Sequence, residues 1–82
     1  MSGDVLLAHK VIVARSHALW VIGALGQAYF HGLTSLQQFD LECRRLRVAF
    51  VGADADEAAL EKLKLETATI EEFLAGLAAK RS

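Results

Sequence analysis

The sequence predicts a small α/β domain in which a two- or three-stranded sheet is packed by about four helices. Three observations lead to this fold class. Two short runs, residues 10–14 and 47–52, are apolar on both faces, as strands inside a parallel sheet are. The segments around them repeat apolar residues at helical spacing. Glycine or a capping residue marks several ends of those segments. The expected element order is β-α-α-β-α-(β)-α.

The chain is expected to form a single domain over residues 1–82. It has no proline, no low-complexity tract and no internal repeat, so no linker divides it. Hydrophobic residues make up 54% of the sequence, which argues against disorder because roughly 45–50% is usual for a globular domain. Residues 1–4 and 80–82 are expected to fray.

Charge and cysteine content limit the classes of partner and compartment. The net charge of −1 provides no overall field that would attract nucleic acid or an anionic membrane. Residues 1–53 carry five basic and three acidic groups, and residues 54–82 carry four basic and seven acidic groups, which makes a mild dipole. A single cysteine and the lack of a secretory signal pattern predict a cytoplasmic location.

The first two elements are expected to be a strand within residues 5–14 and a helix over residues 17–31. The strand follows from the β-branched run at residues 10–14, and the helix is framed by Ser16 as its N-cap and Gly32 after its end. Twelve of the thirteen residues from 18 to 30 are apolar or glycine, so this helix has no polar face. The run covers only about 20 Å as a helix, less than the roughly 30 Å of a bilayer core, so no membrane span is expected.

A second helix is expected at about residues 35–46, followed by a strand at residues 47–52. Either Thr34 or Ser35 has the spacing of a capping box with a glutamine three residues later. The apolar stripe of this helix consists of Leu36, Phe39, Cys43 and Leu46. Gly52 is expected to end the strand.

The last third of the chain predicts two more helices. Asp54 or Asp56 caps the first of them, which runs through Leu63, and residues 64–68 are either a loop or a short third strand. Thr69, with Glu72, caps the final helix. That helix has the most regular apolar spacing in the chain, formed by Ile70, Phe73, Leu74, Leu77 and Ala78.

The apolar helix at residues 17–31 carries the functional prediction. A helix without a polar face must be covered, and a chain this short has little material to cover it. We therefore expect a non-catalytic interaction or regulatory module, either a homo-oligomer or the small subunit of a complex. The opposing interpretation is a single-chain core, in which a central helix is equally apolar. The predicted interface residues are Trp20, Ile22, Leu25, Tyr29 and Phe30.

A helix-turn-helix that binds nucleic acid is one alternative, with the helix at residues 35–46 in the major groove. Two glutamines would read adenine edges and three arginines would meet phosphates. These residues are Gln37, Gln38, Arg44, Arg45 and Arg47. Asp40 and Glu42 on the same helix oppose this interpretation, and an ordinary helical hairpin gives the same pattern.

Nucleotide or phosphate binding at Gly23–Gly26 is the other alternative. If residues 18–22 were a strand, residues 21–28 would resemble the strand–glycine–helix turn of the nucleotide-binding Rossmann folds, with Asp54 beyond a second strand. The third glycine of that fingerprint is missing, and Asp54 is too far along the chain. Two glycines on a helix, which let another backbone approach, are the preferred explanation of the spacing.

No catalytic or metal-binding motif is found, so an enzyme is not indicated and neither a cofactor nor a metal is expected. His17 and His31 would lie about 21 Å apart along one helix and cannot share an ion. Cys43 has no cysteine or histidine at ligand spacing and falls on an apolar stripe, where it would be a small buried side chain.

Overall fold

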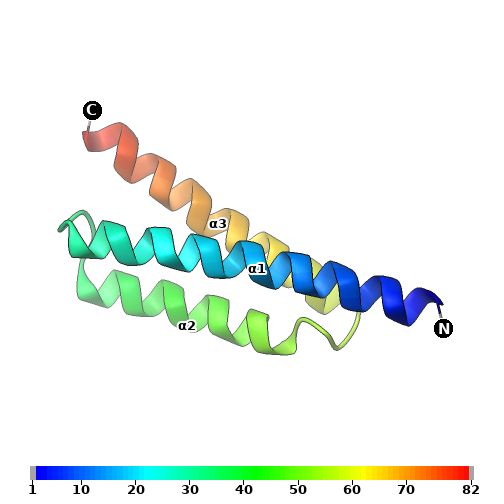
Figure 1. The fold of residues 1–82 in the computed structure, drawn as a ribbon. Coiled ribbons are helices and arrows are strands. Elements are labelled where there is room, and N and C mark those ends of the chain that lie inside the picture. Colours follow the sequence, from blue (N-terminus) through cyan, green and yellow to red (C-terminus); the bar gives the residue numbers. More distant parts are fainter. Residues whose placement is uncertain (1, 82) are drawn as a thin grey trace.

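The protein is a bundle of three helices in a computed structural model that describes residues 2–81. The helices are α1 (Ser2–Phe30), α2 (Leu36–Gly52) and α3 (Glu57–Arg81). Neighbouring helices in the chain run in opposite directions, so that α1 and α3 point the same way (Figure 1). The bundle is elongated, with extents of 48 × 22 × 16 Å.

The predicted α/β fold is wrong, because no strand occurs among residues 2–81. All three segments predicted as strands are helical: residues 10–14 lie in α1, residues 47–52 end α2, and residues 64–68 lie within α3. A run that is apolar on both faces is typical of a buried strand but also of a helix that is apolar all round. No glycine or proline separates residues 5–22. The chain therefore continues as one helix.

The helix ends at the two turns agree better with the predictions made from the sequence. Gly32 adopts a positive φ of 75°, and Leu33 N donates to Ala28 O at 2.9 Å, which closes the end of α1 as predicted. Ser35 is the N-cap of α2, and its Oγ accepts from Gln38 N at 3.1 Å. Asp56 Oδ1 accepts from Ala59 N at 2.8 Å at the start of α3. The prediction for Gly32 is therefore confirmed, and Ser35 and Asp56 are the caps among the two pairs of candidates that the sequence leaves open.

Two predicted caps are wrong. Ser16 lies in the middle of α1, and Thr69 lies in the middle of α3, where its hydroxyl donates to Leu65 O at 2.9 Å. Serine and threonine also occur inside helices when their hydroxyl bonds to the carbonyl four residues before. Of the termini expected to fray, residues 1 and 82 lie outside the described residues, while the backbone of residues 2–4, 80 and 81 is helical.

The core is a single seam between the three helices. α1 contributes residues spaced by three or four, and three of the six are alanines, which let the helices approach closely. These residues are Val11, Ala14, Ala18, Val21, Leu25 and Ala28. Leu60, Leu63 and Ile70 from α3 and Leu46 from α2 fill the space between them. The inward positions of α1 are therefore used by its own bundle.

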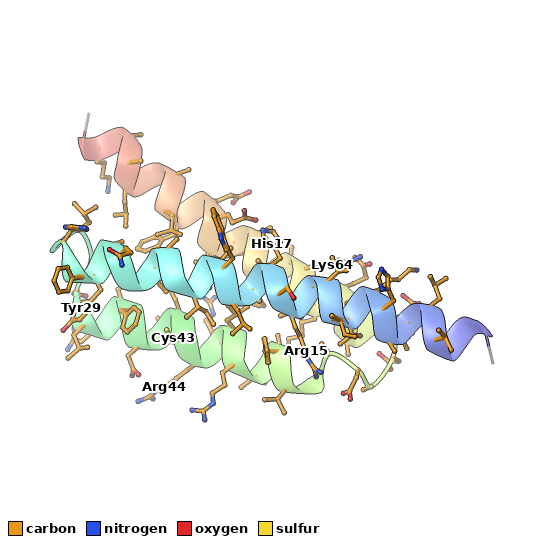
Figure 2. The ribbon with its side chains drawn as sticks, viewed as in Figure 1. Arg15, His17, Tyr29, Cys43, Arg44 and Lys64 are labelled. Carbon is orange, nitrogen blue, oxygen red and sulfur yellow. The ribbon has the colours of Figure 1, made fainter. Side chains whose placement is uncertain are left out.

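Polar contacts also join the helices. Arg15 Nε donates to Phe50 O at 2.9 Å and Arg15 Nη2 donates to Val51 O at 3.1 Å, which caps the last turn of α2 from α1. His17 Nε2 lies 3.2 Å from Glu71 Oε2 and connects α1 to α3. The side chain of Arg15 points from α1 toward α2, and the side chain of His17 points toward α3 (Figure 2).

Candidate interaction surface

The side of α1 that faces away from the bundle is apolar and exposed. We define the outward face of α1 as eight residues, of which none is charged: Ile12, Val13, Ser16, Leu19, Trp20, Gly23, Gln27 and Phe30. Val5, Leu6 and the imidazole of His9 continue it toward the N-terminus. A surface helix ordinarily presents polar residues opposite its buried side. α1 instead has apolar residues on both sides.

The two aromatic residues on this face are the most exposed of the large hydrophobic side chains described on α1. Trp20 is 78% exposed and Phe30 is 82% exposed. Beside Trp20 the face is hollowed by an open depression of about 420 Å³, lined by Leu19, Trp20, Gly23, Ala24 and Gln27. No heavy atom outside the α1 backbone lies within 4 Å of a Cβ built on Gly23. The bundle itself therefore does not require glycine at this position.

The five predicted interface residues have different environments. Trp20 and Phe30 are exposed, whereas Leu25 is 0% exposed at the centre of the core and Ile22 packs against that core. Tyr29 stacks on Phe39 of α2, with ring centroids 5.1 Å apart. Only Trp20 and Phe30 are thus free to meet a partner fully.

Part of the outward face is not among the predicted interface residues. Ile12 and Val13 fall in a predicted strand, and Leu19 is not singled out by the apolar run, yet all three are more than half exposed. The sequence does contain a pattern that places these three residues on one face. The pairs 12/13 and 19/20 are seven residues apart, which places them on one side of any continuous helix.

A second groove lies between α1 and α2. Its volume is about 380 Å³ and its lining is mostly apolar, formed by Leu19, Ile22, Cys43, Arg47, Phe50 and Val51. Burial raises the pKa of the Cys43 thiol, and the nearby carboxylates of Asp40 and Glu42 add to this. The thiol is therefore held protonated and is poorly suited to act as a nucleophile.

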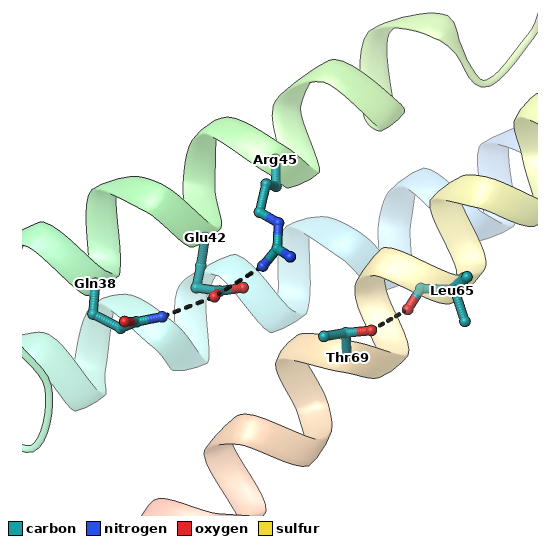
Figure 3. A network of polar contacts seen from close by, with 5 residues as sticks. All are labelled: Gln38, Glu42, Arg45, Leu65 and Thr69. Atoms are coloured by element: carbon teal, nitrogen blue, oxygen red, sulfur yellow. Dashed lines mark hydrogen bonds and ion pairs between the residues drawn. The ribbon is translucent and has the colours of Figure 1, made fainter.

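The residues of the nucleic-acid alternative are largely engaged within α2. Glu42 Oε1 accepts from Gln38 Nε2 at 2.9 Å and lies 3.3 Å from Arg45 Nη1 (Figure 3). Arg44 Nη2 lies 2.8 Å from Asp40 Oδ2. Gln37 and Arg47 are exposed. α1 and α2 also run side by side in opposite directions, whereas the helices of a helix-turn-helix cross at about 90–120°.

Gly23 and Gly26 both lie inside α1. A phosphate-binding turn needs a strand that ends in a glycine loop and a helix that begins there, because free backbone amides hold the phosphate. Both glycines are instead followed and preceded by continuous helix. As for metals, no group of three His, Cys, Asp or Glu side chains that could hold an ion occurs within the described part of the chain.

The length of α1 also bears on membranes. Within the described residues, Val5–Phe30 is long and apolar enough to cross a bilayer by length and composition alone. The unbroken helix is longer than the run of residues 18–30 considered in the sequence. Only 22% of an 18-residue apolar stretch of this helix is buried in the bundle, so packing in the core explains little of the apolar character of the helix.

Known proteins add no further information about this surface. Neither the family models, nor the curated proteins, nor the solved structures with which the chain was compared give a match.

Proposed function

We propose that this protein is a non-catalytic assembly module that binds another protein surface through the outward face of α1. The observation that carries the proposal is the exposure of Trp20 and Phe30 on a face that has no charged residue and that the other two helices leave uncovered. Tryptophan and other aromatic residues are enriched where interfaces derive most of their binding energy.

The number of side chains on this side of α1 is sufficient for association. Burying one large apolar side chain contributes about 1.5–3 kcal/mol, and somewhat less when it is already partly covered. Association costs on the order of 4–15 kcal/mol in lost freedom of motion. The seven large apolar residues are Val5, Leu6, Ile12, Val13, Leu19, Trp20 and Phe30. Their summed contribution is of the same order as the cost, which predicts moderate rather than very tight binding.

The experiment compares the wild-type chain with a Trp20→Gln/Phe30→Gln double variant. Mass by light scattering and fluorescence of an apolar dye are measured for both. Val48→Gln is the matched control, because Val48 is 68% exposed on α2 and lies outside the outward face of α1. We expect association, or dye binding by an uncovered face, in the wild type and in the control, and loss of both in the double variant.

Two results would overturn the proposal. One is a strict monomer that binds no dye. The other is binding to vesicles of neutral or anionic lipid, with no protein association in their absence, which would assign α1 to a bilayer instead.

A further inference from the structure

The outward face of α1 carries a projecting side chain and a depression side by side. The indole of Trp20 is exposed on it and forms one wall of the open depression over Gly23, to which Leu19, Ala24 and Gln27 also contribute. A projection and a depression that lie side by side on one surface fit a second copy of that surface when the two are related by a two-fold axis.

We propose that the partner is a second copy of this chain, paired with the first through α1 in antiparallel orientation. This inference rests on the proposed function and specifies its partner. The two-fold axis lies on the outward side of α1, at the level between residues 21 and 22 of both helices. Trp20 of one copy then lies over Gly23 of the other.

The same register also matches four further residues of the face. Ser16 lies opposite Gln27, so that a hydroxyl meets an amide, and Val13 lies opposite Phe30, so that two apolar side chains meet. A parallel pair would instead set Trp20 against Trp20 and leave Gly23 facing Gly23, with a collision at one position and a void at the other. Unfilled space and collision are both costly in an interface. Antiparallel pairing avoids them.

Charge is also compatible with a pair. Lys10 and Arg15 lie off the outward face of α1, since Lys10 lies 4.0 Å from Glu57 and Arg15 is bonded to α2, so pairing through this face need not bury either charge. Burying an unpaired charge would oppose association strongly.

Cross-linking tests the orientation. In a Cys43→Ala background, Ser16→Cys and Gln27→Cys proteins are prepared separately and treated with a short bis-maleimide reagent, alone and as a mixture. In the antiparallel pair identical positions lie about 16 Å apart along the helices, whereas position 16 of one copy faces position 27 of the other. We expect a cross-linked dimer in the mixture and little in either protein alone.

A second pair of variants tests the hollow. Gly23→Leu fills it, and we expect the dimer dissociation constant to rise at least tenfold. Gly76→Leu on α3 is the matched control, because neither glycine has a neighbour within 4 Å of a built Cβ. Both substitutions improve helix propensity, so circular dichroism should show both proteins folded. Only Gly23→Leu should weaken the dimer.

The possible failures are distinguishable. Three results would overturn the antiparallel pairing and leave the proposed function standing. They are efficient cross-linking of either cysteine variant alone, no cross-linking in the mixture although a dimer forms, and a dimer dissociation constant that Gly23→Leu does not change. A monomer that binds apolar dye would overturn the second copy as partner in the same way. A monomer without dye binding would overturn both.

Discussion

At the scale of single residues, Arg15 has the most defined role. It lies next to the apolar stretch of α1, and its guanidinium donates to the carbonyl oxygens of Phe50 and Val51. Its carbon Cζ is also 5.3 Å from the centroid of the Phe50 ring, and Nη2 is 3.7 Å from Asp54 Oδ1. A cation at the C-terminal end of a helix satisfies carbonyls that have no partner within the helix. The sequence has no local sign of this contact, because 35 residues separate Arg15 from Phe50.

Arg15→Ala should lower the free energy of unfolding by about 1–2 kcal/mol, since two hydrogen bonds to the end of α2 and the contact with Phe50 are lost together. Urea denaturation followed by circular dichroism measures this. Arg47→Ala is the control, because the described residues give Arg47 no ion-pair partner, and it should change stability by no more than about 0.5 kcal/mol. Equal effects of the two substitutions would contradict the role of Arg15.

Cys43 should react slowly with iodoacetamide. Its raised pKa means that the thiolate, which is the reactive form, is scarcer at neutral pH than in a free cysteine. The rate measured against pH should therefore rise at higher pH in the folded protein than in the protein unfolded in urea. Coincident profiles would show that burial and the neighbouring carboxylates do not affect the thiol.

At the scale of elements, the sequence predicts the turns between the helices better than it predicts the structure of the segments expected to be strands. Gly32, Ser35 and Asp56 are recognisable because capping depends on a few adjacent residues. Residues 10–14 and 47–52 resemble strands because β-branched residues without a polar face satisfy either structure. Which structure forms depends on the packing of distant helices, and no local pattern contains that information.

The candidate interaction surface is also predicted only in part. The apolar run identifies Trp20 and Phe30, and both are exposed. Leu25, which is predicted to join them at the interface, lies fully buried in the core of the bundle. The side of α1 that faces the core is settled only when α2 and α3 are in place. Periodicity cannot separate the two sides of a helix that is apolar on both.

Leu63→Ala in α3 should lower the free energy of unfolding by about 2–5 kcal/mol, because Leu63 is fully buried in the core between the helices and its truncation leaves a cavity. Thermal and urea unfolding measure the loss. Leu65→Ala two residues away is the control: Leu65 is 66% exposed, and its truncation should cost no more than about 0.5 kcal/mol. Comparable losses would contradict the orientation of α3.

At the scale of the whole molecule, the bundle covers one side of α1 and leaves the other uncovered. A chain of 82 residues folded as three helices cannot surround its first helix, so the apolar surplus of the sequence becomes a surface rather than a larger core. Contiguous apolar surface of this kind on a small protein is typical of a site of interaction. The proposed function therefore depends on whether that surface takes part in association.

The mass of the wild-type protein in solution, measured by light scattering across a dilution series, tests this claim most directly. The chain has a mass of 8.9 kDa, and we predict about twice that value at high concentration, with a concentration-dependent fall toward the monomer. A constant mass of one chain at every concentration, together with no binding of an apolar dye, would contradict it.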